Sequence, residues 1–123
     1  MTKAGMNDVK THLEQARAFQ AQADYRSAER SLLLALEAAT QLYSDPSLVV
    51  EALQMLSGFY GQMGQHTEAL AQAAWALELL KAKLGAEHPA LKPVLLTMAA
   101  WLTEDGQTAE AQRLEKAAAH LKG

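Results

Sequence analysis

Apolar residues recur along this chain at steps of three and four positions, the spacing that places side chains on one face of an α-helix. The pattern is clearest mid-sequence, where a stretch with large apolar residues precedes one with small ones. The two sets are Leu53, Leu56, Tyr60 and Met63, then Ala69, Ala73, Ala76 and Leu77. Small residues opposite large ones let two antiparallel helices pack closely, and the apolar flank left on such a pair predicts a neighbouring pair.

Helix-breaking and capping residues divide the sequence into six predicted helices. Asn7 or Asp8 is expected to cap the first, and Asp24 the second. The glycines at 64 and 85 are expected to end helices in the left-handed conformation, and Ser44-Asp45-Pro46 separates the second helix from the third. The predicted helices run from about 8 to 23, 24 to 43, 46 to 63, Gly64 to Gly85, His88-Pro89 to Gly106 (loosely as far as Pro93), and 108 to 121.

One short phrase occurs three times at a nearly fixed interval. Aligned on Ala28, Ala69 and Ala111, its copies lie 41 and 42 residues apart. A period of this length is typical of stacked helical repeats. We therefore predict a single domain over residues 8–122, after a flexible N-terminus of residues 1–7. Its repeats are expected at about 8–45, 46–87 and 88–122.

Composition narrows the class further. The chain has 123 residues, half of them hydrophobic, with few glycines and prolines, which favours one all-α domain with a real core. The formal charge of −3, without a run of Lys or Arg, argues against nucleic acid and anionic membranes as partners. No stretch has the apolar length of a signal peptide or a membrane span. Because cysteine is absent, thiolate metal sites and disulfides are excluded. We expect a soluble, cytoplasmic protein without cofactor or metal.

Residues 56–69 resemble the tetratricopeptide repeat signature. They have a large apolar residue followed by a small one, an aromatic residue, a turn glycine and an alanine, in the order Leu56, Ser57, Tyr60, Gly64 and Ala69. Residues 98–111 keep this pattern with leucine in place of the aromatic residue. The first unit matches less well, because Ala23 stands where the turn glycine is expected. The long period and the segment 84–89 resemble the kinesin-light-chain variety of this family.

The resemblance implies an α-solenoid of three stacked helix-turn-helix repeats, forming a right-handed superhelix. The first helix of each pair would line a concave groove, and the second would form the convex back. By this analogy, the partner groove comprises Lys10, Leu13, Arg17, Gln20, Glu51, Gln54, Gly58, Gly61 and Gln62. Leu13, Gly58, Pro93 and Thr97 provide no cluster of Lys, Arg and Asn, so we do not expect a clamp for a partner's C-terminal carboxylate.

Two features of these surfaces each allow two interpretations. Gly58 and Gly61 share a helix face, and they form either a notch for a partner backbone or an ordinary packing site and a frayed helix end. On the convex back, Leu34, Ala71 and Trp75 form either an apolar oligomer interface or a surface covered by residues 83–90. The C-terminal edge is a further candidate for contact with another subunit.

Catalysis is not expected from this sequence. The four histidines are scattered over different units, with none four residues from another, and the chain has no phosphate-binding glycine loop or nucleophile elbow. Our first hypothesis is a protein-binding adaptor that holds a partner's peptide or helix in the groove. The alternatives are a homodimeric scaffold that uses the convex back or the C-terminal edge, and a small secretion-type chaperone.

Overall fold

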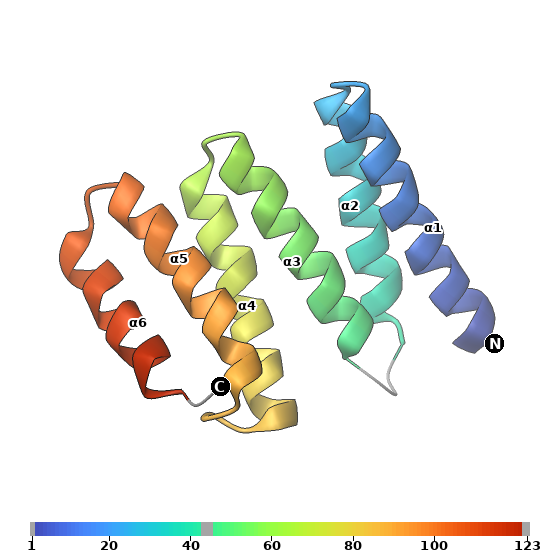
Figure 1. Ribbon diagram of the computed structural model, residues 1–123. Helices are drawn as coiled ribbons and strands as arrows, with labels where there is room; N and C mark the ends of the chain where they lie inside the picture. Colours follow the sequence, from blue (N-terminus) through green and yellow to red (C-terminus); the bar gives the residue numbers. More distant parts are fainter. Residues whose placement is uncertain (1, 43–45, 122–123) are drawn as a thin grey trace. The chain divides into compact units, whose positions relative to one another are not determined.

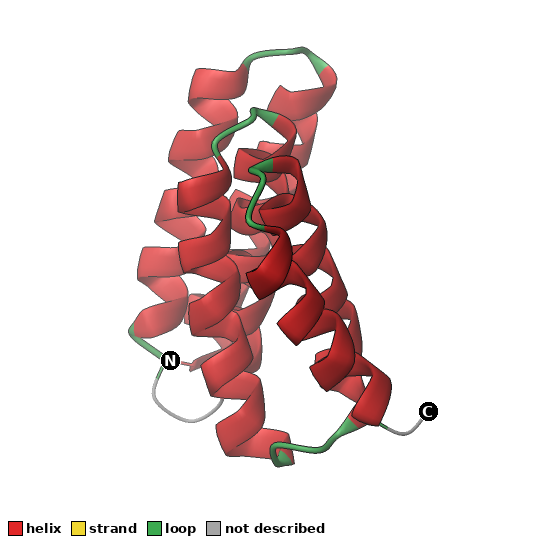
Figure 2. Cartoon of the chain, turned by 90° about the vertical axis from the view of Figure 1, so that its left-hand side faces the viewer, coloured by secondary structure: helices red, strands yellow, loops and turns green. Residues whose placement is uncertain are grey.

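The computed structural model describes residues 2–42 and 46–121, and this part of the chain is α-helical without a β-strand (Figures 1 and 2). It has six α-helices and one short 3₁₀ helix. They are α1 (Thr2–Ala21), α2 (Tyr25–Thr40), α3 (Ser47–Gln62), α4 (His66–Leu84), η1 (Pro89–Leu91), α5 (Lys92–Glu104) and α6 (Thr108–His120). The all-α class predicted from the sequence is confirmed for the described residues.

The chain divides into two compact units, Met1–Phe59 and Tyr60–Gly123. The first contains α1, α2 and most of α3, and the second contains the last residues of α3 together with α4, η1, α5 and α6. The boundary therefore falls inside a helix and coincides with no linker in the sequence. The three-repeat solenoid and its superhelical hand stay predictions.

Three helices end in the same backbone turn, in which a residue with positive φ follows the helix and two amides bond back to the last turn. In each turn, one of these bonds joins residues five positions apart: Asp24 N to Phe19 O at 2.9 Å, Gln65 N to Tyr60 O at 2.9 Å, and Gln107 N to Leu102 O at 2.8 Å. The residues with positive φ are Ala23 (61°), Gly64 (77°) and Gly106 (81°), and they keep the 41- and 42-residue spacing of the sequence repeat. An alanine in this conformation is strained by about 1 to 2 kcal/mol, so the first turn is the least favourable of the three.

The next helix starts directly after each of these turns. Asp24 caps α2, because its carboxylate accepts a hydrogen bond from the amide of Ser27 at 3.3 Å, as the sequence predicts. Gln65 and Gln107 hold the same position before α4 and α6, but neither makes a capping bond with its side chain. These two helices therefore begin without the capping contact that α2 has.

The connection between α4 and α5 follows a different course from these turns. Gly85 has φ 100° and ψ 153°, which lies outside the left-handed helical region predicted for it and is accessible essentially only to glycine. The backbone leaves α4 extended in this way, and His88 then caps η1 by accepting a hydrogen bond from the Ala90 amide at 3.0 Å. The predicted loose start of the fifth helix is thus a 3₁₀ turn, followed by an α-helix from Lys92.

In the first unit, α1 and α2 lie side by side and antiparallel (Figure 1). Their facing positions are completely or almost completely buried, and α2 contributes mainly alanines, so that the two backbones come close. The buried residues are Val9, Leu13 and Ala16 of α1 with Ala28, Leu32, Ala35 and Ala39 of α2. Leu53 and Leu56 of α3 are fully buried as well.

The core of the second unit joins α4, α5 and α6 around a cluster of Ala99, Leu102 and Ala111. Leu70 of α4 and Leu114 of α6 pack against this cluster. Ala28, Ala69 and Ala111, the alanines that mark the sequence repeat, are each at most 1% exposed. The recurrence of a small residue at these three positions therefore reflects close helix packing rather than a binding role.

Several predicted details are wrong. The first helix begins at Thr2 and not at residue 8, so the structure has helix where the sequence predicts a flexible N-terminus. The last helix, by contrast, ends at His120, in agreement with the predicted end near residue 121. Met63 is 44% exposed and lies outside the buried stripe, because α3 ends at Gln62 and the chain turns there. The predicted end of the second helix at Tyr43 and the Ser44-Asp45 stop lie outside the described residues.

Candidate interaction surfaces

Part of the predicted groove forms a small pocket in the first unit. It has a volume of about 170 Å³ and lies between α1 and α3. Its lining residues are Lys10, Leu13, Glu14, Arg17 and Glu51. Four of these, Lys10, Leu13, Arg17 and Glu51, belong to the predicted groove set, and residues 10, 13, 14 and 17 follow one another along one face of α1.

The pocket presents charges of both signs. Lys10 and Arg17 contribute two cations and Glu14 and Glu51 two carboxylates, all exposed. The guanidinium of Arg17 also reaches the sulfur of Met55 on α3 at 3.7 Å, a weak hydrogen bond that links the two helices. Such a lining suits polar and charged groups of either sign and does not select for one net charge.

Leu13 lines this pocket but is only 1% exposed, so it serves the core of the first unit and offers a partner little surface. The predicted groove residues outside the pocket lie elsewhere. Gln20 is half-buried, and Gln54 and Gly58 are exposed on α3. Gly61 and Gln62 belong to the second unit. The site assignment for these residues stays a prediction.

The two glycines of α3 have different surroundings. A Cβ added to Gly58 would meet no heavy atom within 4 Å, whereas one added to Gly61 would lie 2.5 to 2.7 Å from three indole atoms of Trp101. Trp101 is only 9% exposed and belongs to the core. Gly61 is therefore occupied by an internal contact with Trp101 and is not free to accept a partner backbone. The notch hypothesis is wrong at this position.

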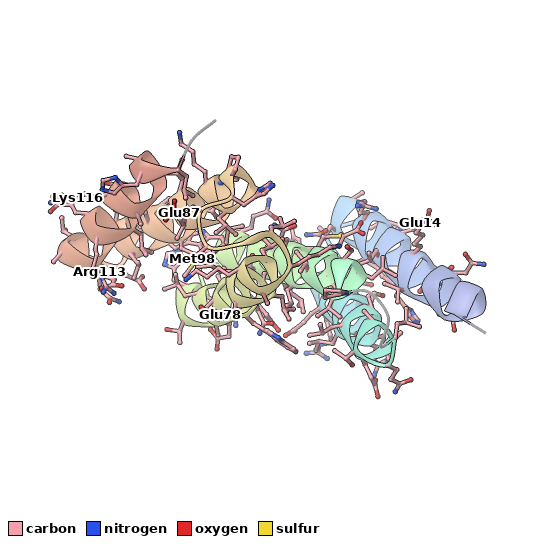
Figure 3. All side chains as sticks on the ribbon, turned by 90° about the horizontal axis from the view of Figure 1, so that it is seen from below. Glu14, Glu78, Glu87, Met98, Arg113 and Lys116 are labelled. Carbon is pink, nitrogen blue, oxygen red and sulfur yellow. The ribbon has the colours of Figure 1, made fainter. Side chains whose placement is uncertain are left out.

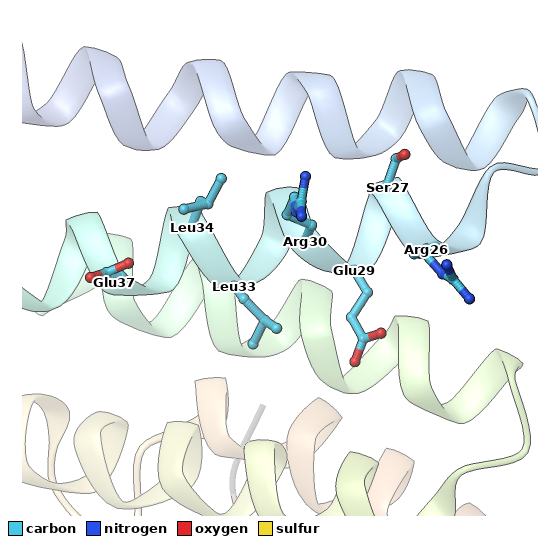
Figure 4. Close-up of a pocket in the computed structure, with 7 residues that line it drawn as sticks. All are labelled: Arg26, Ser27, Glu29, Arg30, Leu33, Leu34 and Glu37. Atoms are coloured by element: carbon cyan, nitrogen blue, oxygen red, sulfur yellow. The ribbon is translucent and has the colours of Figure 1, made fainter.

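The predicted convex residues are exposed. Leu34 and Trp75 have exposed fractions of 41% and 44%, and Ala71 is exposed as well. The alternative in which residues 83–90 cover Trp75 is therefore not what the structure has. Leu34 also lines a cavity of about 470 Å³ whose described lining comes entirely from α2 (Figure 4). Those residues are Arg26, Ser27, Glu29, Arg30, Leu33, Leu34 and Glu37.

A histidine between two carboxylates lies in the second unit, and the sequence reasoning missed it. His66, the first residue of α4, places Nδ1 2.7 Å from Asp105 Oδ1 and Nε2 3.0 Å from Glu104 Oε1. The hydrogen bond with Asp105, aided by the negative charges of Asp105 and Glu104, raises the pKa of His66 although desolvation opposes this. The repeat period could have revealed the contact, because it brings the turn after α3 beside the turn after α5.

His66, Glu104 and Asp105 each carry a charge that is unfavourable at its own helix end, and the contact between them offsets this. A protonated His66 lies at the positive end of the α4 dipole, and Glu104 and Asp105 lie at the negative end of α5. Each charge would be destabilising alone, but together they join the start of α4 to the end of α5. We interpret this cluster as a structural contact within the second unit.

The raised pKa predicts a pH-dependent stability. Folding favours the protonated ring, so the stabilisation is complete below the ordinary pKa of 6.5 and is lost as the pH rises through the higher folded value. We expect His66→Gln to lower the melting temperature most below the ordinary pKa of 6.5, and progressively less as the pH rises above it. Circular dichroism melting curves of both proteins over this range test the prediction, and two parallel curves would contradict it.

Comparison with known proteins supports the repeat reading for one part of the chain. Residues 49–90 match the family model of the tetratricopeptide repeat, which corresponds to about a third of the sequence. The matched segment contains most of α3, all of α4 and the connection after it. A search of curated proteins found no match. Within the described residues, no helix is both long and apolar enough to cross a membrane.

Proposed function

We propose that this protein is a non-catalytic interaction module that binds a peptide or a helix of a partner protein. The binding surface is the groove lined by the first helices of its helical pairs, within a three-repeat solenoid. The observation that carries the proposal is the pocket at which Lys10, Arg17 and Glu51 meet, on two helices that are separated in sequence. The tetratricopeptide repeat match adds support, since repeats of this type generally mediate contacts between proteins.

The groove is expected to provide specificity more than binding strength. Its pocket is small, and its exposed groups are charged, so each contact that they make with a partner competes with water. A partner segment would gain most by pairing one carboxylate with Arg17 and one cation with Glu51. The mixed lining therefore favours a polar segment with charges of both signs.

Selection from a displayed library of random linear peptides, with the full chain as target, tests this proposal. We expect the recovered peptides to bind Arg17→Glu at least about tenfold more weakly than the original protein, by titration calorimetry. Arg30→Glu is the matched control, because Arg30 is an exposed arginine on α2 that lies outside the groove pocket. If no selected peptide distinguishes Arg17→Glu from Arg30→Glu, the groove proposal fails.

A homodimeric scaffold is the second candidate, and the exposure of Trp75 favours it. A tryptophan that is 44% exposed offers a large apolar surface, and such residues often form the centre of a protein contact. Under this alternative, Trp75→Glu should convert a dimer to a monomer in analytical ultracentrifugation while the helical content stays unchanged. The original protein sedimenting as a monomer at all concentrations would exclude the alternative.

A further inference from the structure

A third pocket lies wholly within the second unit and has no part in the predicted groove or the convex back. Its volume is about 340 Å³, and it opens between the C-terminal half of α4, the connection to α5, α5 itself and α6. The lining residues are Leu77, Lys81, Ala86, Leu91, Leu95, Arg113, Leu114, Ala117 and Leu121. This volume is at the lower end of the range for pockets that bind ligands, about 300 to 1,000 Å³.

The walls of this pocket are apolar and firmly packed. Leu91 is 1% exposed, and Leu77 and Leu95 are 7% exposed, so the floor consists of side chains that the core already fixes. Ala86 and Ala117 at the edge are exposed, and their small size keeps the pocket open along one side. A pocket of this form can admit apolar side chains without prior rearrangement of the core.

The described residues that line this pocket carry charges of one sign. Among them, Lys81 and Arg113 are charged, and none of the described lining residues is a carboxylate. The other two pockets differ, since each has two arginines or lysines and two glutamates in its lining. The lining of this third pocket therefore favours a ligand that has both apolar groups and carboxylates.

The two cations can accept a new partner. Lys81 pairs with Glu78 at 3.6 Å and Arg113 pairs with Glu110, each within its own helix, and neither glutamate lines the pocket. Arg113 projects outward from α6 (Figure 3), with 74% of its side chain exposed. Exposed pairs of this kind contribute little stability, so an incoming carboxylate can compete for these cations at small cost.

We propose that this pocket is a second protein-binding site, which takes apolar side chains of an acidic partner segment. Its leucine floor receives the apolar side chains, and Lys81 and Arg113 pair with carboxylates beside them in the partner sequence. A protein segment is favoured over a small amphiphile because the pocket is open along the Ala86 and Ala117 edge and its two cations come from different helices. Such a site can pair with two carboxylates spaced along a chain, whereas a fatty acid has only one.

The test uses the same displayed library. Peptides that bind Ala117→Phe, in which the pocket is blocked, are removed first, so that the remaining peptides are enriched for binding at this pocket. We expect recovered peptides to combine leucine, isoleucine or phenylalanine with aspartate or glutamate. Their dissociation constants should rise at least about tenfold in Arg113→Glu and in Ala117→Phe. Binding should weaken as salt increases, because the cations are exposed.

Two controls on the same helix separate this site from general effects. Lys116 and Ala119 are exposed on α6 but do not line the pocket, so Lys116→Glu and Ala119→Phe should bind the peptides as the original protein does. Arg17→Glu should also leave their binding unchanged, which distinguishes this site from the groove. The proposal is overturned if no acidic, apolar peptide is recovered, or if the controls weaken binding equally. It is also overturned if sodium decanoate binds at this pocket and no peptide does.

Discussion

Replacing Gly61 with alanine should destabilise the protein by about 1 to 3 kcal/mol, the usual effect of overfilling a packed site. The added methyl group would lie 2.5 to 2.7 Å from Nε1, Cε2 and Cζ2 of Trp101. These atoms belong to a rigid ring in the core, so relief requires movement of the whole indole or of α3. Helix propensity alone would predict the opposite sign, since alanine is normally the better helix former.

The neighbouring glycine provides a matched control. Gly58→Ala on the same helix meets open space, and it should stabilise the protein by about 0.5 to 1 kcal/mol. In a Trp101→Leu background, Gly61→Ala should lose most of its penalty, so the two substitutions should couple in a double-mutant cycle. Urea denaturation of the original protein, the two single variants Gly61→Ala and Trp101→Leu, and the double variant measures this coupling. Equal effects of Gly61→Ala with and without the indole would contradict the proposed contact.

Leu56→Ala should reduce the free energy of unfolding by about 2 to 5 kcal/mol. Leu56 is fully buried, so its replacement by alanine removes three buried carbon atoms and leaves a cavity that the surrounding helices fill only in part. Because this cost is comparable to much of the stability of a small protein, we expect the variant to be partly unfolded at elevated temperature.

Met63→Ala tests the same helical stripe at its exposed end. Met63 follows the spacing of Leu53, Leu56 and Tyr60, but it is 44% exposed, so its truncation should change stability by no more than about 0.5 kcal/mol. Guanidinium denaturation of both variants gives the comparison. A large loss for Met63→Ala would show that this side chain packs more tightly than its exposure indicates.

The sequence predicts the helices well where local chemistry alone decides their ends. Gly64 and Gly106 take up positive φ after their helices, and Asp24 caps α2 as expected. The prediction fails at the start of α1, where a capping residue is present but no proline precedes it. Residues 2–7 contain no proline and continue α1, although Asn7 and Asp8 are good capping residues.

The candidate sites were harder to predict because they depend on contacts between helices. Lys10, Leu13 and Arg17 share one face of α1 and line one pocket, but neither the helical period nor the family resemblance reveals that Leu13 is buried. Gly61 illustrates the same limit, since its role depends on an indole 40 positions later in the chain. The third pocket joins four segments, and no local motif indicates it.

The three repeated turns share one backbone path but reach it with different residues. The first has a side-chain cap and a strained alanine, and the other two have a relaxed glycine and no side-chain cap. None of these turns combines both favourable residues. The turn inside each helix pair is therefore built from different residues along the same backbone path, and none of these turn residues lines a pocket described above.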